Sequence, residues 1–186
     1  MEKAVKTAMA ALTFLLLFTL EAGPLFANSP DPCELFPQGE AEALMGMEAA
    51  SARQSGAVSP AGRVCTYFFK KDGGTFDAKL RIGSDGEIAA EGIFDSAADA
   101  FTRQVEARKK HEYASAKYRE LETPGAEAFW NGVSVWALKD GLLLIITVNP
   151  PLGGTFASMD EATAAKEEKS LDFSLKILES ALGKLP

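Results

Sequence analysis

The sequence predicts an α+β domain in which one antiparallel sheet of about five to seven strands is covered by two or three helices. Three observations support this class. Short β-prone runs are joined by tight turns, segments with helical spacing lie before, between and after them, and 47% of the residues are hydrophobic, which suits a packed core. The predicted order is one helix, three strands, a second helix, three more strands and a last helix.

Residues 1–27 are predicted to be a signal peptide. Lys3 and Lys6 precede an apolar run over residues 8–20, which is shorter than the roughly 20 apolar residues that cross a bilayer. Ala27 is the small residue expected before a cleavage site, so the mature chain should begin at Asn28. We therefore expect a periplasmic or secreted protein with one α+β domain over residues 28–186, and a retained membrane anchor is the alternative.

The first half of the domain should contain one helix and a set of strands. The expected elements are a helix over 31–45 that stops at Gly46, a strand followed by a loop within 51–62, and strands over 63–70 and 75–82. In the last strand, apolar residues alternate with Asp77, Lys79 and Arg81. One face of that strand should therefore meet the core and the other should meet water.

The second half should repeat this pattern. The expected elements are a helix over 96–112 that begins at a cap on Asp95 or Ser96, a meander of strands over 126–130, 133–138 and 142–148, and a helix over 159–182. Residues 142–146 are apolar on both faces, which indicates a central strand covered twice. A Lys-Asp-Gly turn occurs in each half, so an internal duplication stays open.

The two cysteines are predicted to form a disulfide. Cys33 and Cys65 are 32 positions apart and lack the C-x-x-C spacing of a redox motif. In an oxidising compartment such a pair is more often bridged than metal-binding. Lipid attachment at Cys33 is rejected because Asp31 and Pro32 stand where a lipoprotein needs a small residue.

The charge balance restricts the partners. The chain has 26 acidic and 19 basic residues, for a formal net charge of -7, and its sequence shows no basic patch. Nucleic-acid backbones and anionic membrane surfaces repel such a protein. We expect no nucleic-acid partner and no stable membrane insertion after signal cleavage, which leaves an unidentified envelope protein or a small molecule.

No catalytic, cofactor-binding or metal-binding residue is assigned. His111 is the only histidine, so a catalytic triad or a multi-histidine zinc site would depend on it alone. It follows the basic run 108–110. Basic residues at the C-terminus of a helix interact favourably with the helix dipole, so this run does not require a functional site. We therefore expect a protein without enzymatic activity.

Three aromatic residues of the second meander have two interpretations. Phe129, Trp130 and Trp136 are either core residues beneath a helix or an exposed patch for a partner. We prefer the core interpretation.

Three short motifs resemble a known group. Asp31-Pro32-Cys33-Glu34-Leu35, Cys65-Thr66-Tyr67 and the segment 124–130 resemble the D-P-C-x-L-L, C-x-Y/W and G-x-x-A-x-W landmarks of uncharacterised exported bacterial domains, many of them actinobacterial lipoproteins. The resemblance implies a Mog1/PsbP-like α+β fold and a disulfide between the first two motifs, and it supplies no catalytic residue. The chain departs from the group in lacking a lipobox, which argues against a membrane tether.

The leading hypothesis is a non-enzymatic binding or accessory module of the cell envelope. The second is a secreted inhibitor or interaction protein that acts through a sheet face, and the third is an envelope hydrolase. A flat exposed aromatic face would favour the inhibitor, and a deep pocket with convergent carboxylates would favour the hydrolase.

Overall fold

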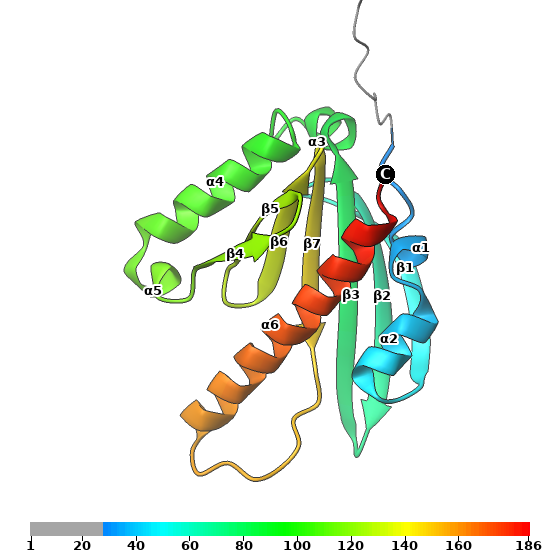
Figure 1. The fold of residues 1–186 in the computed structure, drawn as a ribbon, viewed down its shortest axis with the longest axis vertical. Coiled ribbons are helices and arrows are strands. Elements are labelled where there is room, and N and C mark those ends of the chain that lie inside the picture. Colours follow the sequence, from blue (N-terminus) through cyan, green and yellow to red (C-terminus); the bar gives the residue numbers. More distant parts are fainter. Residues whose placement is uncertain (1–27) are drawn as a thin grey trace, which may run out of the picture.

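The computed structural model describes residues 28–186, so the signal peptide expected over residues 1–27 lies outside the described residues. Seven antiparallel strands form one sheet in the spatial order β1-β2-β3-β7-β6-β5-β4 (Figure 1). The strands are β1 Ala49–Ala57, β2 Gly62–Lys71, β3 Gly74–Ser84, β4 Arg119–Thr123, β5 Ala126–Trp130, β6 Ser134–Lys139 and β7 Leu142–Asn149. The helices are α1 Pro32–Leu35, α2 Gln38–Met45, α3 Asp85–Glu91, α4 Ala97–Lys110, α5 Glu112–Ser115 and α6 Met159–Lys184. The predicted α+β class with an antiparallel sheet is confirmed.

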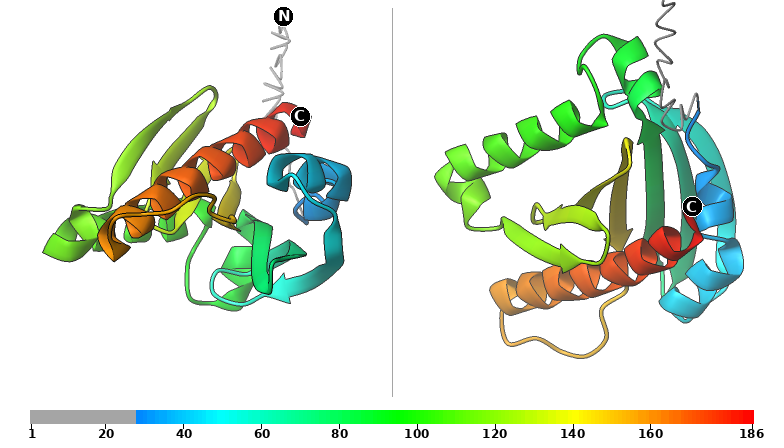
Figure 2. Two further views of the ribbon diagram at one scale, coloured as in Figure 1. Left: turned by 90° about the horizontal axis from the view of Figure 1, so that it is seen from below. Right: turned by 45° about the horizontal axis from the view of Figure 1, so that its top comes forward.

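Each face of the sheet carries its own hydrophobic core. On the first face, α1, α2 and α6 cover side chains such as Leu80 and Leu144. On the second face, α3 and α4 cover side chains such as Leu143 and Phe129. Figure 2 (right) shows β5 and β6 lying between α4 and α6. β7 contributes to both cores, as its two-sided apolar sequence predicts.

The predicted first helix is divided in two. Pro37 lies between α1 and α2, where its fixed φ and missing N–H end one helix and begin the next. Gly46 ends α2 with a left-handed φ of 68°, as expected for a glycine stop. The helix α3 is an addition that the sequence pattern did not indicate.

The two halves of the chain are not built alike. The second half has four strands rather than three, because residues 119–123 pair with β5 as an edge strand. If the halves were duplicated, a two-fold axis perpendicular to the sheet would have to relate strands β1–β3 to strands β5–β7. That rotation keeps each face of the sheet on its own side, so equivalent helices would lie on the same face. The helices before the two strand sets lie on opposite faces, since α2 belongs to the first core and α4 to the second. The turns at Asp72-Gly73 and Asp140-Gly141 are similar because tight hairpins favour Asp-Gly, whose residues adopt positive φ here, and not because the halves are duplicated.

A capping box connects α3 to the beginning of the described chain. The Glu87 carboxylate accepts hydrogen bonds from Ser84 N at 2.8 Å and from Ser29 N at 3.3 Å. Burial raises the pKa of Glu87, but the hydrogen bonds from Ser84 and Ser29 outweigh it, so the pKa lies below its ordinary value of 4.5. The ionised carboxylate therefore holds residue 29 against α3.

This geometry predicts an acid-sensitive contribution to stability. Because the folded-state pKa of Glu87 is depressed, its stabilisation is present above about pH 4.5 and is lost as the pH falls through the folded value. Glu87→Gln should lower the free energy of unfolding at pH 7. Between pH 7 and pH 3.5, the free energy of unfolding should fall less in this variant than in the parent protein. Urea unfolding at both pH values measures the effect, with Glu106→Gln on the exposed side of α4 as the control. An equal acid loss in the parent and in Glu87→Gln would contradict this role.

Candidate functional site

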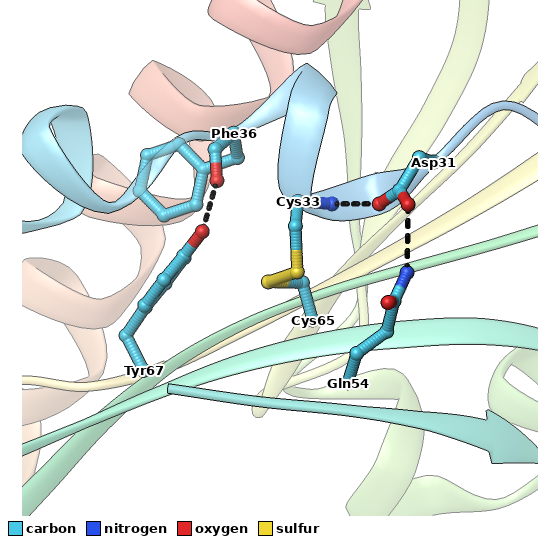
Figure 3. Close-up of a disulfide and its surroundings, with 6 residues drawn as sticks. All are labelled: Asp31, Cys33, Phe36, Gln54, Cys65 and Tyr67. Atoms are coloured by element: carbon cyan, nitrogen blue, oxygen red, sulfur yellow. Dashed lines mark hydrogen bonds between the residues drawn. A yellow bond between two sulfur atoms is a disulfide. The ribbon is translucent and has the colours of Figure 1, made fainter. Parts of the chain in front are cut away.

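The predicted disulfide joins α1 to β2. Cys33 and Cys65 are bridged with their Cα atoms 5.2 Å apart (Figure 3). Asp31 supports the same junction, because its carboxylate accepts from Cys33 N at 2.7 Å and from Gln54 Nε2 at 2.9 Å. Since both sulfurs are bonded, this junction holds the fold together and offers no nucleophile.

The three aromatic residues considered as a partner surface are buried. Phe129 and Trp130 are each 1% exposed and Trp136 is 9% exposed, so the exposed-patch interpretation is wrong for them. The reason is that helices cover both faces of the meander. Trp130 belongs to the first core, whereas Phe129 and Trp136 stack in the second core with ring centroids 6.1 Å apart. Trp136 also lines a surface hollow.

That hollow lies on the second face of the sheet, at the border of the region covered by α4. The helix packs on β6 and β7, and beyond it β2 and β3 present partly exposed side chains on the same face. The resulting groove has a volume of about 440 Å³. We call it the basic groove and define it by its floor on β3, β7 and β6, with one wall from α4. The floor residues are Lys79, Arg81, Ile145, Thr147, Ser134 and Trp136, and Gln104 and Arg108 form the wall.

Strand register arranges the floor in two rows. Lys79 pairs with Thr147, which pairs with Ser134, and we call these three residues the polar row. The Oγ atoms of Ser134 and Thr147 are 2.7 Å apart. In the next row, Arg81 pairs with Ile145, which pairs with Trp136. Cβ atoms of paired residues lie roughly 5 Å apart, so the cation of each row lies directly beside the neighbouring floor residue of that row.

The groove concentrates positive charge in an acidic chain. Lys79 Nζ lies 2.6 Å from Asp77 Oδ2, whereas no ion pair within 4.0 Å involves Arg81 or Arg108 among residues 28–186. Burial lowers the pKa of Arg81, and the nearby Glu91 charge opposes that effect. Arginine stays ionised in proteins, so the guanidinium keeps its charge and its hydrogen-bond donors. Such a site attracts an anion through charge and directed N–H and O–H donors.

Other hollows lack this arrangement. A hollow of about 580 Å³ between β4 and α6 is lined by Glu122 and Glu179 together with leucines, so its charged groups share the sign of the whole chain. His111 is exposed at the end of α4 and does not line the basic groove. Within residues 28–186, no group of three or more His, Cys, Asp and Glu side chains is arranged to hold a metal ion.

The sequence interpretation missed the groove although it named Lys79, Arg81 and Trp136. The alternation along residues 75–82 placed Lys79 and Arg81 on the face away from the core, but Arg108 was explained by the helix dipole alone. The only local signal was a pair of cations two positions apart on one strand face.

Of the helices over residues 28–186, none has the length and apolar character needed to cross a bilayer. No protein-family model, no curated protein and no solved structure matches the chain.

Proposed function

We propose that the protein is an exported, soluble binding module of the cell envelope that holds a small organic anion in the basic groove. The convergence of Lys79, Arg81 and Arg108 on one groove of a chain with net charge -7 carries this proposal. The volume of about 440 Å³ lies within the range of small-molecule sites, which are concave and combine apolar lining with a few polar groups.

Export is supported by two independent features. Residues 1–27 have the composition of a signal peptide, with basic residues before a short apolar run. The Cys33–Cys65 disulfide suits an oxidising compartment such as the periplasm or the extracellular space. Together they favour a periplasmic or secreted location.

Binding is favoured over catalysis by the kind of side chain in the groove. Its lining residues are cations, hydroxyls, amides and apolar groups, and none of those within residues 28–186 is Asp, Glu, His or Cys. These groups hold an anion without a general base or a thiolate beside it. The same donors would bind an acidic side chain of a protein partner. An inhibitor or interaction protein, the alternative function, would use the groove in this way.

A neutralising substitution on α4 tests the proposal. The probe is 2-naphthoate, an aromatic carboxylate that fits the groove volume, and its binding is measured by isothermal titration calorimetry. Arg108→Gln should weaken binding roughly 10- to 100-fold, because a charged hydrogen bond is worth about 1.5–3 kcal/mol. Raised salt should also weaken binding to the parent protein.

The matched control is Lys110→Gln, which removes an exposed charge from the same last turn of α4. It should change the affinity less than twofold, because Lys110 does not line the groove. Equal losses in Arg108→Gln and Lys110→Gln would show that the net charge, not the groove, attracts the probe. Absence of 2-naphthoate binding to the parent protein would contradict the proposed function itself.

A further inference from the structure

The two ends of the basic groove differ in chemistry. Strand β3 runs toward α3, and α4 begins beside α3 and runs back, so Arg108 in its last turn lies at the end away from α3. The polar row lies toward that same end, because Lys79 precedes Arg81 along β3. Val64 pairs with Arg81 and so belongs to the second row, and Pro60 and Phe94 line the groove toward α3. The groove thus has a polar end and an apolar end.

The polar end offers donors in a fixed geometry. Asn131 Oδ1 accepts from Val133 N at 2.9 Å and from Ser134 N at 2.8 Å, which fixes the β5–β6 turn at this end. Ser134 is 8% exposed, and its hydroxyl is already hydrogen-bonded to Thr147. Lys79 and Arg108 add two cations beside this hydroxyl pair. Since Asp77 already compensates the charge of Lys79, one carboxylate balances the remaining charge at this end.

The apolar end continues the floor formed by Ile145 and Trp136. Exposed apolar side chains also gather around the groove. Val58, Ile93 and Val133 are 82%, 49% and 64% exposed, and they are three of the five large hydrophobic side chains that are exposed among residues 28–186. Val58 and Ile93 directly precede the lining segments at Ser59 and Phe94, whereas Val133 lines the groove from the β5–β6 turn at the polar end. This apolar border favours a ligand with an apolar body over an inorganic anion.

We infer that the ligand is an amphiphilic monocarboxylate. Its carboxylate lies between Lys79 and Arg108 and accepts hydrogen bonds from the polar row, and its alkyl or aromatic body lies over Ile145 and Trp136 toward Phe94. Arg81 lies between these two parts, where its planar guanidinium can reach the carboxylate or stack on an aromatic body. This inference rests on the proposed function, because it assigns the chemistry of the anion held in the same groove.

A chain-length series tests the inference. Acetate, butyrate, hexanoate and octanoate are titrated into the protein below their micellar concentrations, and 1-octanol serves as the neutral analogue. Each buried methylene should raise the affinity roughly fourfold until the apolar end is filled. Octanoate should therefore bind at least 30-fold more tightly than acetate and more tightly than 1-octanol.

Two isosteric substitutions separate the two ends. Thr147→Val removes one hydroxyl of the polar row and should weaken octanoate and butyrate by the same factor. Val64→Thr makes the apolar end polar and should weaken octanoate several-fold while leaving butyrate within twofold. Both side chains are only partly buried and both replacements keep the branched shape, so the fold should be retained.

The outcomes distinguish this inference from the proposed function. Equal affinities across the acid series would overturn the inference and leave anion binding intact. Equal affinities for 1-octanol and octanoate would overturn the inference because the groove would then select apolar bodies without a charge. Failure of 2-naphthoate and of every carboxylate to bind would overturn both.

Discussion

Replacing Trp136 with alanine is expected to lower the free energy of unfolding by about 3–5 kcal/mol. The indole is 9% exposed and stacks on Phe129, which in turn contacts Phe101 of α4 with ring centroids 5.1 Å apart. Removal of the indole would leave a cavity in the second core beneath α4. For a domain of this size the loss corresponds to a fall in melting temperature of roughly 6–20 °C.

Circular dichroism during urea unfolding measures this effect without relying on the lost fluorophore. Trp136→Phe keeps most of the stacked contact and should cost less than the alanine variant. Tyr113→Ala, at a side chain that is 83% exposed, should stay within about 0.5 kcal/mol of the parent. A Trp136→Ala protein that melts within a degree or two of the parent would show that α4 does not form a tight core with this strand.

Features that depend on a few neighbouring residues were predictable from the sequence. Ser96 caps α4 as expected, with its Oγ accepting from Asp99 N at 3.0 Å. The Asp-Gly turns form at 72–73 and 140–141, and the apolar run 142–146 lies between two cores. Each of these outcomes follows from the spacing of side chains or from a φ preference that acts over a few residues.

Features that depend on the order of strands were not predictable. The contact between β3 and β7 brings Leu80 beside Ile146, two residues that lie far apart in the sequence. No local periodicity specifies that pairing, yet it joins Lys79 to Thr147 and so builds the polar row. Arg108 reaches the same groove only because α4 returns along the second face. The sequence therefore showed individual residues of the candidate site, but only the strand order and the path of α4 show that these residues lie together.

Strand β2 connects the disulfide to the candidate site. Cys65 is fully buried on the first face, whereas the side chain of its neighbour Val64 lies on the second face and lines the basic groove. The bridge therefore stabilises a strand that contributes to the groove without entering the groove itself. Loss of the bridge should act on global stability first and on ligand binding only through unfolding.

Reduction of the Cys33–Cys65 disulfide, or its removal in a Cys33→Ala/Cys65→Ala variant, should lower the free energy of unfolding by about 3–4 kcal/mol. The reason is that the bridge closes a loop over 32 positions, which restricts the unfolded chain. Within that loop β1 is almost wholly exposed, whereas side chains of α1 and α2 such as Leu35 and Met45 are buried in the first core. The expected fall in melting temperature is roughly 6–16 °C.

Thermal unfolding with and without reductant measures this loss. The double-alanine variant is the control, because reductant should leave its melting temperature unchanged. The hydrogen bond from Tyr67 Oη to Phe36 O at 2.8 Å remains in both proteins, so α1 keeps one contact with β2 and the reduced protein should still fold at low temperature. Mass labelling of the native protein should find no free thiol. Two labelled cysteines, or equal melting temperatures for the oxidised and reduced forms, would show that this bridge does not stabilise the native domain.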